Sequence, residues 1–332
     1  MGSATGPFRK ALIAGVLAAA SLGAALDAGA MSARPPGAMR AIIARHPVFA
    51  AWRSRHWAAI DGRVTLVRSW VVHYVAHNHS HRVAIVVLPR WYGPHDHPPI
   101  PFVISPHGRG VRPQANARLW GNLPALGRFA VVNPEGDANV RTSYSWGNAG
   151  QISDLARMPR IVRRALPWLR IAPQRIYAIG GSMGGQETLL LLAKHPHLLA
   201  GAISFDAPTN MAERYGDFPL LKRGLHLQQL ARLEFGGVPR ARHDAWADRS
   251  PIFYSREIAF SNVPLEIWWS TRDRVVVDGA SQSGLLFRAI KRLNPRAPVT
   301  EVVGTWHHTA EMRTIRRMPL ALARMGLLRL RR

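Results

Sequence analysis

Short, continuously apolar runs recur along the chain from residue 102 onward, and stretches with helical periodicity separate them. Such runs are typical of parallel strands that helices bury on both faces. The predicted strands are residues 102–105, 129–133, 176–180, 200–205, 265–270 and 299–303. The predicted helices are residues 152–169, 186–195, 280–293 and 310–328. Because crossovers between parallel strands are right-handed, this order predicts an α/β fold with a doubly wound, mostly parallel sheet.

Two regions depart from this alternation. Strand-forming stretches at 64–67, 71–75 and 83–88, separated by polar turns, predict an antiparallel lead-in before the parallel strands. Residues 207–253 contain short amphipathic pieces interrupted by Gly and Pro, which predicts a small cap inserted above the carboxyl ends of the strands. We therefore expect one catalytic domain over residues 63–332, preceded by an N-terminal extension over residues 31–62.

The first 30 residues have the pattern of a secretory signal peptide. Arg9 and Lys10 precede an apolar stretch over residues 11–26, and small residues at 28–30 offer a cleavage site. The alternative is an uncleaved membrane anchor, although the stretch is shorter than the roughly 20 apolar residues that span a bilayer. The prediction is a secreted or cell-envelope protein.

Composition narrows the classes of function. Of the 332 residues, 47% are hydrophobic, which is ample for a buried core. The net charge of +25 comes mainly from arginines scattered along the chain, with no single basic stripe, so we expect no specific nucleic-acid partner. A cationic exported protein is expected to associate weakly with anionic cell-envelope surfaces at low salt. The chain has no cysteine, which excludes disulfides, a thiolate nucleophile and a cysteine-bound metal.

One short motif carries candidate chemistry. Residues 180–184 read Gly-Gly-Ser-Met-Gly and directly follow the apolar run that ends at Ile179. This matches the G-x-S-x-G pattern, in which a sharp turn from strand to helix needs small residues on either side of an exposed serine. Ser182 is the predicted nucleophile.

A serine hydroxyl needs a histidine to accept its proton and a carboxylate to orient that histidine. Asp273 and His308 each follow a predicted strand, and the chain order Ser, Asp, His is the one used with this motif. His307 adjoins His308 and is the alternative base. Asp206 ends the strand at 200–205 and is the alternative acid.

Ester cleavage also needs two donors for the oxyanion that forms when the serine attacks. The backbone N–H of Met183, next to the predicted nucleophile, is one. The other is expected from the glycine-containing loop at 106–110, where Gly108 or Arg109 would donate. His107 in this loop is interpreted as a brace that holds the loop in place.

Two further sets of residues have more than one interpretation. Alternating histidines at positions 77, 79, 81, 95 and 97 could gather around a metal, but neighbouring Asn, Ser and Pro residues favour surface turns. We therefore predict no metal and no cofactor. The tryptophans at positions 120, 146, 268 and 269 either line an acyl pocket or belong to the core.

With these motifs the chain resembles the α/β-hydrolase superfamily over residues 63–328. It is most similar to exported esterase and peptidase-like members related to polyhydroxybutyrate depolymerases, feruloyl esterases and the catalytic domain of prolyl oligopeptidase. The resemblance implies a serine hydrolase that cleaves carboxylic esters of small molecules through a Ser-His-Asp triad and an acyl-enzyme intermediate. The alternatives are a serine peptidase of the prolyl-oligopeptidase type, whose propeller domain has no counterpart here, and a non-catalytic hydrolase-like envelope protein.

Overall fold

A computed structural model describes residues 50–53, 66–136, 145–313 and 317–329 of the chain. The predicted signal peptide lies outside these residues, as does most of the predicted N-terminal extension. None of the helices in the described part of the chain combines the length and the apolar character that a membrane crossing requires.

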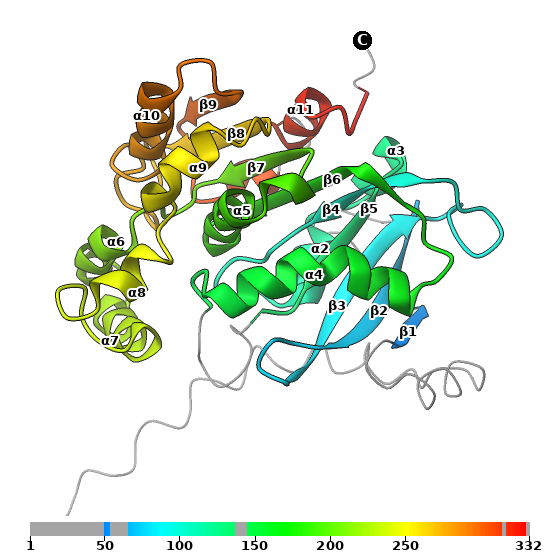
Figure 1. Ribbon diagram of the computed structural model, residues 1–332, viewed down its shortest axis with the longest axis horizontal. Coiled ribbons are helices and arrows are strands. Elements are labelled where there is room, and N and C mark those ends of the chain that lie inside the picture. Colours follow the sequence, from blue (N-terminus) through cyan, green and yellow to red (C-terminus); the bar gives the residue numbers. More distant parts are fainter. Residues whose placement is uncertain (1–49, 54–65, 137–144, 314–316, 330–332) are drawn as a thin grey trace, which may run out of the picture.

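The described residues form a mixed sheet of nine strands in the order β1-β2-β3-β5-β4-β6-β7-β8-β9 (Figure 1). The strands are β1 (Ala50–Arg53), β2 (Val67–Val75), β3 (His81–Pro89), β4 (Ile100–Ile104), β5 (Ala130–Pro134), β6 (Ile171–Gly181), β7 (Gly201–Phe205), β8 (Leu265–Ser270) and β9 (Val299–Gly304). The pairs β1–β2, β2–β3 and β3–β5 are antiparallel, whereas every pair from β5 to β9 is parallel. The predicted α/β class, the mostly parallel sheet and the antiparallel lead-in are confirmed.

Helices cover both faces of this sheet. The α-helices are α2 (Pro113–Arg118), α3 (Leu123–Gly127), α4 (Ala149–Ala165), α5 (Met183–Lys194), α6 (Met211–Asp217), α7 (Gly224–Phe235), α8 (His243–Ala247), α9 (Ser255–Ala259), α10 (Ser283–Leu293) and α11 (Arg317–Arg324). Residues of α4, α5, α9 and α10 pack in one apolar cluster with one face of the sheet, and residues of α2 and α11 pack in a second cluster with the other face. Because side chains alternate along a strand, Phe102 and Ile104 of β4 belong to the first cluster and Val103 to the second. This burial on both faces explains the continuous apolar runs in the sequence.

Two predicted boundaries were wrong. The break predicted between 64–67 and 71–75 is absent from the described residues, because β2 runs without interruption from Val67 to Val75 and pairs with β3 along its whole length, while residues 64 and 65 lie outside the described part. Within the helix predicted over 310–328, the described residues form a 3₁₀ turn, η5 (Ala310–Arg313), and the shorter α11, while residues 314–316 lie outside the described part of the chain. α11 ends at Arg324, and Gly326, with φ +68°, follows its end.

Residues 207–253, which we call the cap, leave the sheet between β7 and β8. They contain α6, α7, α8 and two 3₁₀ turns, η3 (Phe218–Leu220) and the first part of η4 (Pro251–Tyr254). Figure 1 shows the three α-helices together at one corner of the molecule, far from β1. Their apolar side chains form a third cluster, which also includes Trp146 and Met183. The cap therefore shares its core with the residue that follows Ser182.

Candidate functional site

Ser182 occupies the sharp turn between β6 and α5. Its backbone has φ 58° and ψ −128°, a combination that residues with a Cβ rarely adopt and that costs about 1–3 kcal/mol. The glycines on either side are required by close packing, because a Cβ on Gly180 would lie 2.4 Å from the carbonyl oxygen of Gly184. A Cβ on Gly184 would lie 2.2 Å from the carbonyl oxygen of Pro106. The motif thus has the strand-turn-helix context that a nucleophile elbow requires.

Asp273 and His308 form a direct pair at the ends of β8 and β9. His308 Nδ1 lies 2.6 Å from Asp273 Oδ2, a length typical of a charge-assisted hydrogen bond. The other carboxylate oxygen, Oδ1, accepts hydrogen bonds from the backbone N–H groups of Val275 at 2.7 Å and Val276 at 3.1 Å. The carboxylate is therefore fixed, and it fixes the imidazole. His307, the alternative base, is exposed.

Asp206, the alternative acid, holds the loop that carries His308. Its Oδ2 accepts hydrogen bonds from the backbone N–H of Thr309 at 2.7 Å and from Trp306 Nε1 at 3.2 Å. Asp206 also lies beside the catalytic candidates, since one carboxylate oxygen each of Asp206 and Asp273 and one ring nitrogen of His308 lie within 4.8 Å of one another. Asp206 thus binds the backbone just after His308 and the Trp306 side chain just before it, while Asp273 orients the ring.

Sequence reasoning missed Glu311, which lies beneath Asp206. Its side chain is fully buried. Burial, followed by the charge of Asp206, raises the pKa of Glu311 to about 10, and burial raises the pKa of Asp206 to about 6. The two carboxyl groups lie close enough to shift each other's pKa. Two carboxyl groups so close cannot both ionise cheaply, so the raised pKa keeps Glu311 protonated at neutral pH.

The turn that carries Ser182 packs against the loop that carries His308. A Cβ on Gly181 would lie 3.1 Å from Thr309 Cγ2 and 2.3 Å from Met312 Sδ. Only a glycine before Ser182 allows this approach. The structure therefore brings Gly181, which precedes the predicted nucleophile, close to Thr309, which follows the predicted base.

The predicted oxyanion loop faces Ser182. A Cβ on Gly108 would lie 3.8 Å from Ser182 Cβ, and Arg109 lines the same cavity as Ser182 and Met183. His107 braces this loop, because its Nε2 accepts a hydrogen bond from the backbone N–H of Gly136 at 2.9 Å. Its Nδ1 lies 2.8 Å from the carbonyl oxygen of Gly108 and therefore carries the ring's proton. Burial lowers the pKa of His107, which keeps the ring neutral in this role.

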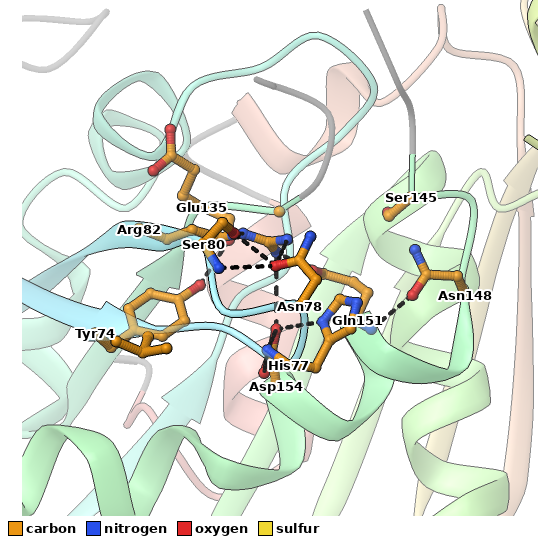
Figure 2. A network of polar contacts seen from close by, with 12 residues as sticks. Tyr74, His77, Asn78, Ser80, Arg82, Glu135, Ser145, Asn148, Gln151 and Asp154 are labelled. Carbon is orange, nitrogen blue, oxygen red and sulfur yellow. Dashed lines mark hydrogen bonds and ion pairs between the residues drawn. The ribbon is translucent and has the colours of Figure 1, made fainter. Parts of the chain in front are cut away.

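A buried polar network packs next to His107 and the loop that it holds (Figure 2). Arg82 Nη1 donates to Gln151 Oε1 at 3.1 Å, and His77 Nδ1 lies 2.8 Å from Asp154 Oδ2. Figure 2 shows these side chains meeting between the hairpin of β2 and β3 and the start of α4. Gly136 joins the network to the loop, since a Cβ there would lie 2.9 Å from Gln151 Nε2 and 3.1 Å from His107 Nε2. His77 therefore belongs to this network.

A cavity of about 30 Å³ adjoins Ser182. Ser182 and Met183 form one side of it. The other lining residues are Arg109 of the loop after β4, Trp146 before α4, Pro208, Met211, Arg214 and Phe218 of the cap, and Val275 and Val276 of the loop after β8. Of the four tryptophans considered in the sequence, Trp146 lines this cavity, whereas Trp120, Trp268 and Trp269 pack in the two sheet clusters. Six of these lining residues, all outside the predicted motifs, had no signal in the sequence.

No protein-family model matches the sequence, and no curated protein matches it. Solved structures do match. S-formylglutathione hydrolase from Staphylococcus aureus superposes with a TM-score of 0.58 at 16% identity, over 79% of this chain and 100% of its own. Acetyl xylan esterase 1 from Thermoanaerobacterium superposes with a TM-score of 0.55 at 13% identity, over 88% of this chain and 94% of its own. Acylaminoacyl peptidase of Pyrococcus horikoshii superposes with a TM-score of 0.58 at 16% identity. The superposition covers 79% of this chain but only 41% of the peptidase.

Proposed function

We propose that this chain, which has the α/β-hydrolase fold of those structures, is a serine hydrolase that cleaves carboxylic esters of small molecules. The observation that carries the proposal is the 2.6 Å pair of His308 and Asp273 at the strand ends beside the strained turn of Ser182. A serine in that backbone conformation costs stability, and such strain is retained where it serves a function. The neighbouring esterases support the same class of chemistry.

In the proposed mechanism, Ser182 Oγ attacks the ester carbonyl while His308 accepts its proton. Asp273 holds the Nδ1 proton of His308 and stabilises the imidazolium that forms. The backbone N–H of Met183, together with that of Gly108 or Arg109, donates to the oxyanion. His308 then protonates the leaving alcohol, and water releases the acyl group from Ser182 by the same steps in reverse.

An ester is proposed ahead of a peptide bond because of the extent of the similarity. The chain covers the whole of the S-formylglutathione hydrolase but less than half of the acylaminoacyl peptidase. The rest of that peptidase has no counterpart in the described residues. If amides of the same acyl group were cleaved faster than the esters, the peptidase alternative would replace this proposal.

Wild type and two variants test the proposal. Wild type is expected to hydrolyse 4-nitrophenyl butyrate and to react with a fluorophosphonate probe, which labels only an activated serine. Ser182→Ala should lose both, while Ser281→Ala, which removes a serine hydroxyl from the loop before α10, should keep both. Unlabelled wild type would favour the non-catalytic alternative, and an active Ser182→Ala would refute the mechanism.

The proposal includes export and loose attachment to the cell envelope. Its support is the signal-like pattern of residues 1–30 and the net charge of +25. Sequencing the N-terminus of the mature protein should find it after residue 30. Retention on an anionic matrix should fall as salt rises, and salt-independent retention would contradict the electrostatic explanation.

A further inference from the structure

Arg214 is a buried arginine of the cap that lines the cavity beside Ser182. It lies in α6, whose first turn is capped by Asn210, and its side chain is only 5% exposed. Nη2 donates a hydrogen bond to the carbonyl oxygen of Val275, in the loop that also binds Asp273. The guanidinium lies over the ring of Phe218, 5.1 Å from its centroid. The side chain is therefore held in place at the wall of the cavity.

The other terminal nitrogen of Arg214 has no hydrogen bond. Within the described part of the chain, no acceptor lies within hydrogen-bonding distance of Nη1, although this atom is buried. Nη1 forms a long ion pair with Asp217, whose Oδ2 lies 3.8 Å away, beyond the usual 2.7–3.2 Å of an N–H···O bond. A buried donor without an acceptor costs about 1–3 kcal/mol or more when it is charged. A ligand that supplies an acceptor would recover this cost.

The charge of Arg214 persists in the buried site. Burial lowers its pKa to about 10, so the guanidinium is positive at neutral pH. Arg109 lies on the same cavity and is close enough to lower the pKa of Arg214 further. Asp217 and Asp273 act in the opposite direction, but Asp273 is already bonded to His308 and to two backbone N–H groups. Two arginines, Arg109 and Arg214, therefore line the cavity, and no acidic side chain is among its described lining residues.

We propose that Arg214 binds a carboxylate on the acyl part of the substrate, so that the preferred substrates are half-esters of short dicarboxylic acids. This inference rests on the proposed ester hydrolysis by Ser182. The acyl side follows from the position of His308, which protonates the leaving alcohol but does not line the cavity that contains Arg214. The small volume of the cavity favours a planar carboxylate on a short chain.

The kinetic test compares two esters that differ at one group. Monoethyl succinate carries a carboxylate where ethyl butyrate carries a methyl group, and acid release measures both. Wild type is expected to favour monoethyl succinate in kcat/KM. In Arg214→Gln the ratio of the two kcat/KM values should fall roughly 10- to 100-fold, the range expected for a charge-assisted hydrogen bond. A purely structural arginine would lower both values together and leave the ratio unchanged, which would overturn the proposal.

A control separates local binding from the field of a strongly cationic protein. Arg232 in α7 is exposed, and its guanidinium lies over the ring of Tyr215 in the cap, outside the cavity. Arg232→Gln removes the same charge and should leave the ratio unchanged. If Arg232→Gln lowers the ratio as much as Arg214→Gln does, long-range attraction explains the preference and the proposal fails.

If Arg214→Gln does not fold, a second variant tests the proposal. If wild type does not hydrolyse the esters, a binding measurement tests it. Asp217→Asn removes the carboxylate nearest to Nη1 and should raise the ratio for monoethyl succinate, whereas an unchanged or lower ratio contradicts the proposal. Calorimetric binding of monoethyl succinate to Ser182→Ala needs no turnover. Binding should weaken at least tenfold when Arg214→Gln is added, and equal binding by both proteins overturns the inference. Loss of all ester hydrolysis by wild type with this binding intact would refute the proposed function alone.

Discussion

Replacing Glu311 by Gln should change how the stability of the fold depends on pH. The pKa of Glu311 is raised in the fold from its ordinary value of 4.5 to about 10. An acid whose pKa is raised in the folded state contributes full stability below its ordinary pKa, and that stability is lost as the pH rises toward the folded value. A glutamine side chain occupies nearly the same volume and has no proton to lose. Glu311→Gln therefore removes this pH dependence.

The magnitude follows from the pKa values. At pH 7 the unfolded chain has lost the Glu311 proton, and keeping that proton in the fold costs on the order of 3 kcal/mol. The amide brings one N–H more than the acid, and leaving it unmatched costs about 1–3 kcal/mol. At pH 7 the two effects nearly offset. Between pH 7 and pH 9, above the pKa of about 6 of Asp206, the free energy of unfolding of the variant should rise by roughly 3 kcal/mol relative to that of wild type.

Urea unfolding at pH 7, 8 and 9 measures this gain. The control is Glu213→Gln, which changes an exposed glutamate on α6 and should give a free energy of unfolding parallel to that of wild type. Wild type and variants share all other titrating groups, so the contribution of those groups cancels when their free energies of unfolding are compared at the same pH. A constant difference in the free energy of unfolding between Glu311→Gln and wild type across the three pH values would show that Glu311 is already ionised at pH 7. That result would refute the claim that Glu311 keeps its proton.

Three further changes have defined outcomes. Asp273→Asn should lower kcat for 4-nitrophenyl butyrate by about 10³–10⁴-fold, because an amide cannot hold the required histidine tautomer. Gly184→Ala should lower the free energy of unfolding in urea by at least about 2 kcal/mol, because its Cβ would overlap the carbonyl oxygen of Pro106 in the oxyanion loop. The control is Gly216→Ala on α6, where a Cβ meets open space, and it should raise the free energy of unfolding slightly. Because burial lowers the pKa of His107, the urea midpoint of wild type should fall as the pH drops below the ordinary value of 6.5. In His107→Gln that fall should be smaller, and an equal fall would contradict the bracing role.

The sequence was sufficient for the features that depend on local order along the chain. Ser182, Asp273 and His308 each follow a strand that is apolar because both sheet faces are covered, and parallel strands bring their carboxyl ends to one edge. The choice between Asp273 and Asp206 could not be made in this way. Both aspartates follow a strand, and only packing directs one carboxylate to the ring and the other to the backbone of the same loop.

The residues that sequence reasoning missed gain their properties from distant parts of the chain. Arg214 is one arginine among many in an irregular segment, and its importance arises from burial against the loop after β8. In the sequence, Glu311 looks like the start of a helix. It keeps its proton because it is buried and because Asp206, which follows β7, lies beside it. No periodicity or motif encodes such a meeting, since each partner alone is an ordinary polar residue.

The cluster that joins Met183 and Trp146 to the cap also limits how a substrate can enter. Met183 supplies a proposed oxyanion donor, and its side chain packs among the apolar residues of α6 and α7. Gln186 Nε2, one turn along α5, donates to the carbonyl oxygens of Trp146 at 3.0 Å and Arg249 in the cap at 2.6 Å. Lifting the cap as a rigid body would expose this core and displace the oxyanion donor. Turnover should therefore show no interfacial activation, with rates on a short ester that rise smoothly through the concentration at which the ester forms droplets.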